Sequence, residues 1–365
     1  MTPANRTSNQ PNRITKLFGT GVPVVLGPFG GVSSVELTAA VSDGGGLGSY
    51  GLYGLGADAI RNTAAELKTA TAKPFALNLW IPTGDETVSL PQQEFDRYLE
   101  TLKPYFAELG LPLPEMPERY MPDFDEQVEA TLEARPAVVS FVFGVPAPEL
   151  VDEAHRRGIV VVGTATTVAE AVALDAGGVD AVVASGMESG GHRVSFLKPA
   201  EESLVGTFAL VPQVVDAVSI PVIAAGGIAD RRGFAAAMAL GADAVQVGTA
   251  FLATRESAAV PAYRAVLHSP AARETVLTRA LSGRLARGIP NRIVADLTEA
   301  HLTAAEAGIA PFPVQNWLTG RFRPQAAAQG HTELMSLWAG QAASLIRHES
   351  AADVLAELLT GSPVL

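Results

Sequence analysis

The sequence predicts an α/β fold, a closed (β/α)8 TIM barrel with an additional, mainly helical cap domain. Eight short apolar segments between residues 23 and 247 have the length and composition of buried parallel strands. Most of them are followed by a turn and a helical pattern, and eight such units are the number that closes a barrel. An open doubly wound sheet is the competing fold, because one sequence does not show closure. The strand count and the lack of a dinucleotide-binding fingerprint in the first turn weigh against it.

The expected elements follow one another with one interruption, an acidic segment before residue 137. We expect strands at 23–26, 44–49, 75–80, 137–143, 159–162, 179–184, 221–225 and 244–247. Helices are expected at about 34–42, 57–69, 148–157, 167–174, 206–217 and 231–240, with two more at 91–109 and 123–134 inside the acidic segment. Beyond residue 255 the chain is rich in Ala, Arg and Leu, and a last helix at 334–359 is expected to close the barrel.

These elements predict three parts. Residues 1–16 are polar and are expected to form a flexible arm. The barrel is expected to comprise 17–255 and 334–365, with the acidic helical insertion at 84–134. Residues 256–333 are then an excursion between the last strand and the closing helix, and we expect them to cap the mouth of the barrel as a substrate domain.

Composition excludes several classes of protein. Apolar residues make up 48% and charged residues 18% of the 365 residues, which indicates a folded core. No apolar run is long enough to cross a membrane, and the first residues do not resemble a secretory signal. Cysteine is absent, so disulfides and thiolate chemistry are excluded and a cytoplasmic location is expected. The net charge of −12 argues against nucleic acid as a partner.

Charge is unevenly distributed along the chain. The segment 85–133 is strongly acidic, whereas Arg279, Arg284, Arg287 and Arg292 cluster in the expected cap. The arginines can attract an anionic substrate to the mouth or contact a phosphate. They can equally pair with the acidic segment, within one chain or between the subunits of a homodimer. The sequence leaves these alternatives open.

The stretch Asp180–Phe196, DAVVASGMESGGHRVSF, is the strongest candidate for a catalytic centre. Its first half is an expected strand, and its second half places His192 among glycines at the rim of the sheet. Catalytic side chains gather at this rim because the C-terminal ends of parallel strands surround a common mouth. The bland alternative is a surface or capping histidine in a flexible turn. Histidines 268, 301, 331 and 348 have no metal-ligand spacing, and no metal site is expected.

Two glycine-rich turns predict a bound phosphate. Gly226 and Gly227 follow the seventh expected strand, and Gly248 and Thr249 follow the eighth. Barrels of this kind often bind a phosphate with these two loops. Asn78, at the end of the third strand, offers a donor and acceptors to a heteroaromatic edge. A flavin mononucleotide, FMN, has the phosphate, the linker and the polar ring edge that this arrangement would take.

The chain resembles the FMN-dependent nitronate monooxygenases, formerly called 2-nitropropane dioxygenases, from Pro23 to its C-terminus. Seven motifs carry the resemblance in this order: GPFGG at 27–31, NLW at 78–80, VSFVFG at 139–144, TATT at 164–167, SGMESGGHR at 185–193, IPVIAAGGI at 220–228 and VQVGTAF at 245–251. The resemblance implies oxidation of alkyl nitronates, and of nitroalkanes if neutral substrates are accepted, with O2 to carbonyl compounds and nitrite.

The resemblance also implies roles for individual residues. His192 matches the active-site histidine, which can hold the nitronate as an imidazolium or remove the α-proton of a nitroalkane as a neutral base. The implied cofactor-binding residues are Pro28, Phe29, Gly30, Asn78, Ser185, Gly190, Gly191, Gly226, Gly227, Gln246, Gly248 and Thr249. Ser185 departs from the family, many members of which have glutamine there. Serine at 189 and valine at 194 also replace the common alanine and glycine.

Two other functions remain open at the level of sequence. The first is an NAD(P)H-dependent FMN reductase of the same architecture, acting on quinones or enoyl thioesters, since it would use the same FMN loops. The absence of an adenine-dinucleotide fingerprint mildly favours the monooxygenase. The second is a flavin-binding module without turnover, which would tolerate replacement of His192.

Overall fold

The computed structural model describes residues 12–84, 90–298 and 308–361. Eight parallel strands form one sheet in the order β1-β9-β8-β6-β5-β4-β3-β2. They are β1 (Val24–Leu26), β2 (Gly48–Gly51), β3 (Phe75–Trp80), β4 (Val138–Val142), β5 (Val160–Ala165), β6 (Ala181–Ser185), β8 (Val222–Ala225) and β9 (Ala244–Val247). A parallel bridge between Val25 and Leu47 joins the two ends of the sheet. The sheet is therefore a barrel, as the strand count predicts.

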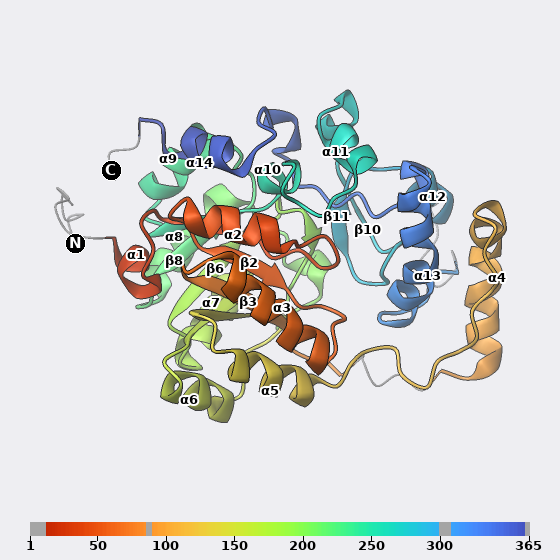
Figure 1. Ribbon diagram of the computed structural model, residues 1–365, viewed down its shortest axis with the longest axis horizontal. Helices are drawn as coiled ribbons and strands as arrows, with labels where there is room; N and C mark the ends of the chain where they lie inside the picture. The colour runs from red at the N-terminus through yellow and green to blue at the C-terminus, as the bar shows by residue number, and fades with distance from the viewer. Residues whose placement is uncertain (1–11, 85–89, 299–307, 362–365) are drawn as a thin grey trace.

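Eight helices surround the barrel, one after each strand (Figure 1). They are α2 (Val35–Asp43), α3 (Ala57–Ala70), α5 (Phe124–Ala134), α6 (Pro148–Arg156), α7 (Val168–Ala176), α8 (Thr207–Ala217), α9 (Arg231–Ala239) and α14 (Ala351–Leu359). Local signals start several of them: Ser34 caps α2, and Thr167 with Glu170 forms a capping box on α7. The helices bury their apolar faces against the outward-pointing strand residues in one large core.

The interior of the barrel is filled by alternate strand residues. Valine and alanine side chains such as Val25, Ala76 and Val138 point inward and form a separate apolar cluster. Helix α1 (Arg13–Phe18) adds Ile14 and Phe18 to this cluster at the N-terminal end of the strands. Residues 13–16 were expected in a flexible arm. They are helical because Asn12 caps α1 and burial of Ile14 and Phe18 fastens it. Residues 1–11 lie outside the described part.

The closing helix is shorter than the sequence predicts. An α-helix was expected at 334–359, but only the last part of this range forms one, α14 from Ala351 to Leu359. Before α14 the chain makes the short 3-10 helices η3 (Thr332–Leu334) and η4 (Ala343–Leu345), and residues 336–341 between them cross to the barrel rim. There the backbone of Trp338 forms an isolated antiparallel β-bridge with Gly288. In addition, Gly340 N donates to Thr249 Oγ1 at 3.0 Å. These contacts outweigh the local preference for a helix.

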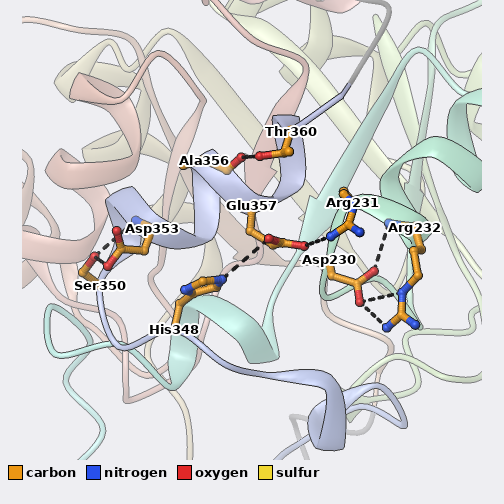
Figure 2. A network of polar contacts seen from close by, with 9 residues as sticks. All are labelled: Asp230, Arg231, Arg232, His348, Ser350, Asp353, Ala356, Glu357 and Thr360. Carbon is orange, nitrogen blue, oxygen red and sulfur yellow. Dashed lines mark hydrogen bonds and ion pairs between the residues drawn. The ribbon is translucent and has the colours of Figure 1, made fainter.

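Helix α14 is fastened to its neighbour α9 by charged groups (Figure 2). Arg231 donates to Glu357 at 3.0 Å, and His348 lies 3.9 Å from the other oxygen of the same carboxylate. Asp230 caps α9 and also pairs with Arg232, while Ser350 caps α14. Because α14 also packs on α2, it covers the junction where the first and last strands meet.

A second apolar core is formed mainly by the helices drawn at the right of Figure 1, beside the barrel. It contains residues of α4 (Gln92–Glu108), α11 (Pro261–Leu267), α12 (Arg292–Leu297) and α13 (Val314–Ala328), and of the short elements α10 (Thr249–Leu252) and η2 (Pro270–Arg273). The 3-10 helix η1 (Ala200–Glu202) lies between β7 and α8 in the chain. Helix α4 packs on α13, with Phe106 against Phe322 at 5.2 Å between ring centroids. The two helices of the acidic segment therefore separate: α4 joins the second core, and α5 covers the barrel beside α3.

A three-stranded antiparallel sheet connects the two parts. Strands β10 (Val276–Thr278) and β11 (Ala286–Gly288) come from the second part, and β11 pairs with β7 (Gly191–His192). Residues 256–333 were expected to be mainly helical, and no strand was expected among them. Here the extended segments form strands because β7 offers β11 a hydrogen-bonding edge beside the barrel mouth.

Candidate active site

The mouth of the barrel has a polar floor. Five of the inward-facing alanines and valines are followed, two residues further along the strand, by a polar residue nearer the C-terminal end. These polar residues are Asn78, Ser140, Thr164, Ser185 and Gln246. Because strand side chains alternate, these five face the same interior. Asn78 Nδ2 donates to Ser140 Oγ at 3.0 Å and to Ser140 O at 3.2 Å, which leaves the amide oxygen of Asn78 as an acceptor toward the mouth.

His192 lies at this mouth, in strand β7. Its backbone pairs with Ala286 of β11, and its Nε2 atom lies 2.8 Å from Ser282 Oγ. The imidazole packs edge-on against Trp80, with ring centroids 5.0 Å apart, and lies 5.5 Å from the ring of Trp338. The histidine is therefore held by a strand pairing, a hydrogen bond and two indole rings. The alternative of a surface histidine in a flexible turn is wrong.

The surroundings of His192 disfavour its charged form. Burial of the ring is the largest cause, and the positive charges of Arg284 and Arg323 add to it; together they lower the pKa of His192 to about 3. The imidazole of the free site is neutral at pH 7. The sequence left open whether this histidine acts as an imidazolium or as a neutral base, and the electrostatics of the structure favour the neutral form.

Aromatic rings and two arginines form the wall above His192. The guanidinium of Arg284 lies over the rings of Phe312 and Phe143, with its Cζ 3.8 and 4.3 Å from the centroids. Trp80 packs against Phe143 and against Tyr53, the latter at 4.2 Å. This wall makes the mouth apolar on one side and positively charged behind it.

Arg323 anchors the far end of this wall. It donates to Ser336 Oγ at 2.6 Å and to Asn316 Oδ1 at 2.9 Å, and Asn316 Nδ2 in turn donates to Tyr53 Oη at 2.6 Å. Within the described ranges no carboxylate forms an ion pair with Arg323, and its Nε atom is buried without a hydrogen bond. Burial lowers the pKa of Arg323 to about 10, so this arginine still carries its charge at neutral pH.

The turns after β8 and β9 form a cradle of backbone N–H groups. Gly226 and Gly227 have φ values of 102° and 72°, which only glycine adopts without strain. Gly248 caps the short helix α10, and the hydroxyl of Thr249 accepts from Gly340 N, so its own proton is free to donate. The N–H groups of Gly226, Gly227 and Thr249 find no acceptor among the residues that the structure describes.

The loop that precedes His192 packs tightly beside this cradle. Arg193 is buried and donates to the carbonyls of Ser185 and Gly186 at 3.0 and 2.7 Å. The carboxylate of Glu188 accepts from the N–H and the hydroxyl of Thr207 at the start of α8. A Cβ on Gly190 would come within 2.6 Å of the Ala339 backbone, so only glycine allows the 336–341 segment to cross here.

The loop after β1 closes the other side of the mouth. Ser33 holds it by donating to Phe29 O at 2.8 Å and accepting from Gly51 N at 3.0 Å. The Phe29 ring lies 3.6 Å from the position that a Cβ on Gly248 would take. The Cβ of Tyr53 lies 3.5 Å from the position that a Cβ on Gly30 would take. Pro28, Phe29 and Gly30 thus lie between the cradle and the aromatic wall.

The structure places His192 and the expected cofactor-binding residues at the C-terminal strand ends and their loops, and it adds several residues that sequence reasoning missed. Ser282, Arg323, Asn316, Tyr53 and Trp338 all come from segments outside the seven motifs. Trp338 and Arg323 reach the mouth only through the fold of residues 308–341. Arg284 was noticed as one of a cluster, but nothing in the sequence separated it from its neighbours.

The four clustered arginines have different partners. Arg292 pairs with Glu108 of α4 at 2.6 Å, which is the pairing with the acidic segment that the sequence allowed. Arg279 pairs with Glu201 at 2.6 Å, outside that segment. Arg287 donates to Met187 O at 3.0 Å and supports the loop before His192. Only Arg284 lies in the aromatic wall.

A barrel whose strand ends carry a polar floor, a cradle of backbone N–H groups and a neutral histidine is the arrangement of a barrel enzyme. The sequence matches the nitronate monooxygenase family over residues 11–361. Two relatives, both described as probable nitronate monooxygenases, come from Staphylococcus aureus strain Newman (36% identical, 95% of this chain and 96% of the relative) and Staphylococcus haemolyticus strain JCSC1435 (39%, 92% of each). The chain belongs to the nitronate monooxygenase family and is an oxidoreductase, which confirms the resemblance seen in its motifs.

Solved structures show the same likeness. The nitroalkane oxidase from Streptomyces ansochromogenes is 35% identical, with a TM-score of 0.84 over 95% of this chain and 97% of that one. FabK from Thermotoga maritima is 30% identical, with a TM-score of 0.73 over 96% of each chain. Within the described ranges no helix is both long and apolar enough to cross a membrane.

Proposed function

We propose that this protein binds FMN across the barrel mouth and oxidises alkyl nitronates with O2, giving a carbonyl compound and nitrite. The observation that carries the proposal is the cradle of unpaired N–H groups at Gly226, Gly227 and Thr249, which shares one opening with the neutral imidazole of His192. Family membership and the likeness to a nitroalkane oxidase support the same substrate class.

The residues of the cradle fit a phosphate. Backbone N–H groups and a hydroxyl donate to an anion without needing a basic side chain, and a glycine-lined turn lets the anion approach closely. A Cβ on Gly226 would meet Ser189 Oγ at 2.6 Å and Thr207 Oγ1 at 2.9 Å, so a larger residue would deform the cradle. The carboxylate of Glu188 is held at the start of α8 by the N–H and the hydroxyl of Thr207.

The proposed FMN contacts divide into three groups. The cradle residues Gly226, Gly227, Gly248 and Thr249 would hold the phosphate. The floor residues Asn78, Ser185 and Gln246 would donate to and accept from the polar edge of the flavin ring. Pro28, Phe29 and Gly30 would border the ring from one side, and the backbone at Gly190 and Gly191 would border it from the other. Bound FMN would supply the electron-accepting chemistry that oxidation of an electron-rich nitronate requires.

His192 and its wall would position the substrate. The indole rings of Trp80 and Trp338 would offer an apolar surface to the alkyl group of the substrate. The positive charges of Arg284 and Arg323 would favour an anion in the mouth. We also propose that the described residues between 256 and 333, together with α4, cover the mouth and limit access of water. A neutral imidazole does not compete with the arginines for the nitronate charge.

Anaerobic mixing tests the proposal. The purified protein is expected to show the absorption of oxidised flavin, and propyl-2-nitronate is expected to bleach it while NADH does not. Admission of air should then restore the absorption and release nitrite. A colourless protein, or one that consumes no oxygen with any nitronate, would contradict the proposal.

The second candidate is the NAD(P)H-dependent FMN reductase that the sequence left open, which would use the same strand-end loops. It predicts the reverse result, bleaching by NADH and none by the nitronate. The same mixing experiment therefore decides between the two.

A further inference from the structure

The hydrogen bond between His192 and Ser282 determines which nitrogen of the imidazole carries the proton. Ser282 is fully buried and lies in the turn between β10 and β11. Its hydroxyl oxygen is 2.8 Å from His192 Nε2 and 3.0 Å from the carbonyl oxygen of Arg284. A serine hydroxyl has one proton to donate, whereas the carbonyl can only accept.

Only one arrangement of protons satisfies both contacts. If the serine hydroxyl donates to the Arg284 carbonyl, then Nε2 must carry a hydrogen and donate to Ser282 Oγ. If the hydroxyl instead donated to a bare Nε2, the oxygen atoms of Ser282 and Arg284 would face each other at 3.0 Å without a proton between them. Two acceptors buried in this way are unfavourable, so the Nε2–H tautomer is the stable one.

The other nitrogen is then free. Nδ1 of His192 makes no hydrogen bond with any described residue, and it is not among the fully buried side-chain atoms that lack a partner. In a neutral imidazole with a hydrogen on Nε2, Nδ1 holds the lone pair. The neutral state is the one that burial and the charges of Arg284 and Arg323 favour.

We propose that Ser282 is a positioning residue, which keeps His192 in the Nε2–H tautomer and so presents Nδ1 as the proton acceptor for a neutral nitroalkane. The substrate class rests on the proposed function; the tautomer does not. In the step itself the α-carbon–hydrogen bond breaks, its electron pair moves into the nitro group to give the nitronate, and the proton passes to Nδ1. The imidazolium and the nitronate form together, and the attraction between their charges offsets the burial of the imidazolium.

The tautomer can be measured without turnover. Nitrogen NMR of the protein labelled with 15N-histidine distinguishes protonated from bare ring nitrogens, and comparison with His192→Asn assigns the signals of His192. The flavin-loaded protein at pH 7 is expected to show a protonated Nε2 and a bare Nδ1. A bare Nε2 with a protonated Nδ1, or a rapidly exchanging mixture of both, would overturn the proposal.

Paired substrates then test the role of Ser282. Nitroethane requires removal of its α-proton, whereas ethyl nitronate has already lost it. A positioned general base contributes about 10²- to 10⁴-fold in rate, so Ser282→Ala is expected to lower kcat/KM by about tenfold or more for nitroethane and by less than about threefold for ethyl nitronate. Its 15N spectrum should show both tautomers.

Ser257→Ala is the matched control, because Ser257 is also buried and its hydroxyl also bonds to backbone carbonyls, those of Leu252 and Thr254. It should leave both substrates and the tautomer unchanged. Equal losses on both substrates in Ser282→Ala would mean that Ser282 only stabilises the fold. If Ser282→Ala does not fold, the spectrum of the unmodified protein still decides the tautomer. Failure of the unmodified protein to oxidise ethyl nitronate would refute the proposed function and leave the tautomer assignment intact.

Discussion

Replacement of Gly226 by alanine tests the anion cradle most directly. Gly226 has φ of 102°, and an added Cβ would lie 2.6 Å from Ser189 Oγ, 2.9 Å from Thr207 Oγ1 and 3.1 Å from Ser189 N. Left-handed backbone costs a residue with a side chain about 1–2 kcal/mol. The contacts to Thr207 and to the Ser189 backbone cannot relax without moving the turns after β6 and β8 apart. We therefore expect the N–H groups of the cradle to lose their common direction.

The size of the effect on FMN follows from the hydrogen bonds at risk. A hydrogen bond to a charged group contributes about 1.5–3 kcal/mol. Misdirecting two of the cradle donors would cost about 3–6 kcal/mol, which corresponds to a loss of about 10²- to 10⁴-fold in affinity. Titration of the apoprotein with FMN, followed by flavin fluorescence, measures this loss, and urea unfolding of the apoprotein measures the cost to stability.

Gly158→Ala is the matched control. Gly158 has φ of 74°, nothing lies within 4 Å of its added Cβ, and it follows α6 at the end of the barrel opposite the mouth. It should lose about 1–2 kcal/mol of stability from backbone strain and keep its affinity for FMN. If Gly226→Ala binds FMN within about threefold of the unmodified protein, the cradle does not hold the phosphate and the reasoning is wrong.

Three further predictions follow from the charges. Because the pKa of His192 is lowered to about 3, kcat/KM for a nitronate should stay constant from about pH 6 to 9. A tenfold fall in kcat/KM per pH unit above about 6.5 would instead show that the reaction requires the imidazolium form of His192. As pH falls, His192 takes up its proton near pH 6.5 in the unfolded chain but only near pH 3 in the folded protein. The free energy of unfolding should therefore decrease as pH drops from about 6.5 toward 3. Urea midpoints at pH 7 and 5 should then differ less in His192→Asn than in the unmodified protein. The Arg292–Glu108 pair is exposed on both sides, and a double-mutant cycle with alanine at both positions should give a coupling of about 1 kcal/mol or less; a larger value would show that it fastens α4 to the second core.

Much of the barrel could be predicted because its signals are local. The strands are continuous apolar runs that must be buried on both faces, and their inward positions alternate with period two. Ser34, Thr167 and Asp123 mark the starts of their helices by capping the first free N–H groups. The second strand was expected at 44–49 but runs from Gly48 to Gly51, since glycine-rich segments carry little pattern from which to set a boundary.

The site was predictable only in part. Asn78, His192 and the glycine turns lie next to strand ends, where a parallel fold gathers functional side chains, so their position follows from the order of elements. Ser282, Arg284 and Arg323 come from segments with no periodic pattern. Their distance to His192 depends on the pairing of β11 with β7 and on the packing of α13 against α4.

The amino-acid sequence by itself determined the eight-fold repeat, the glycine turns at the strand ends and the presence of a histidine at the rim, because each depends on neighbours within a few residues. Tertiary structure alone decided the state of that histidine. The tautomer and the low pKa of His192 arise from a serine ninety residues away and from two distant arginines, and such long-range contacts are determined by how both apolar cores pack together.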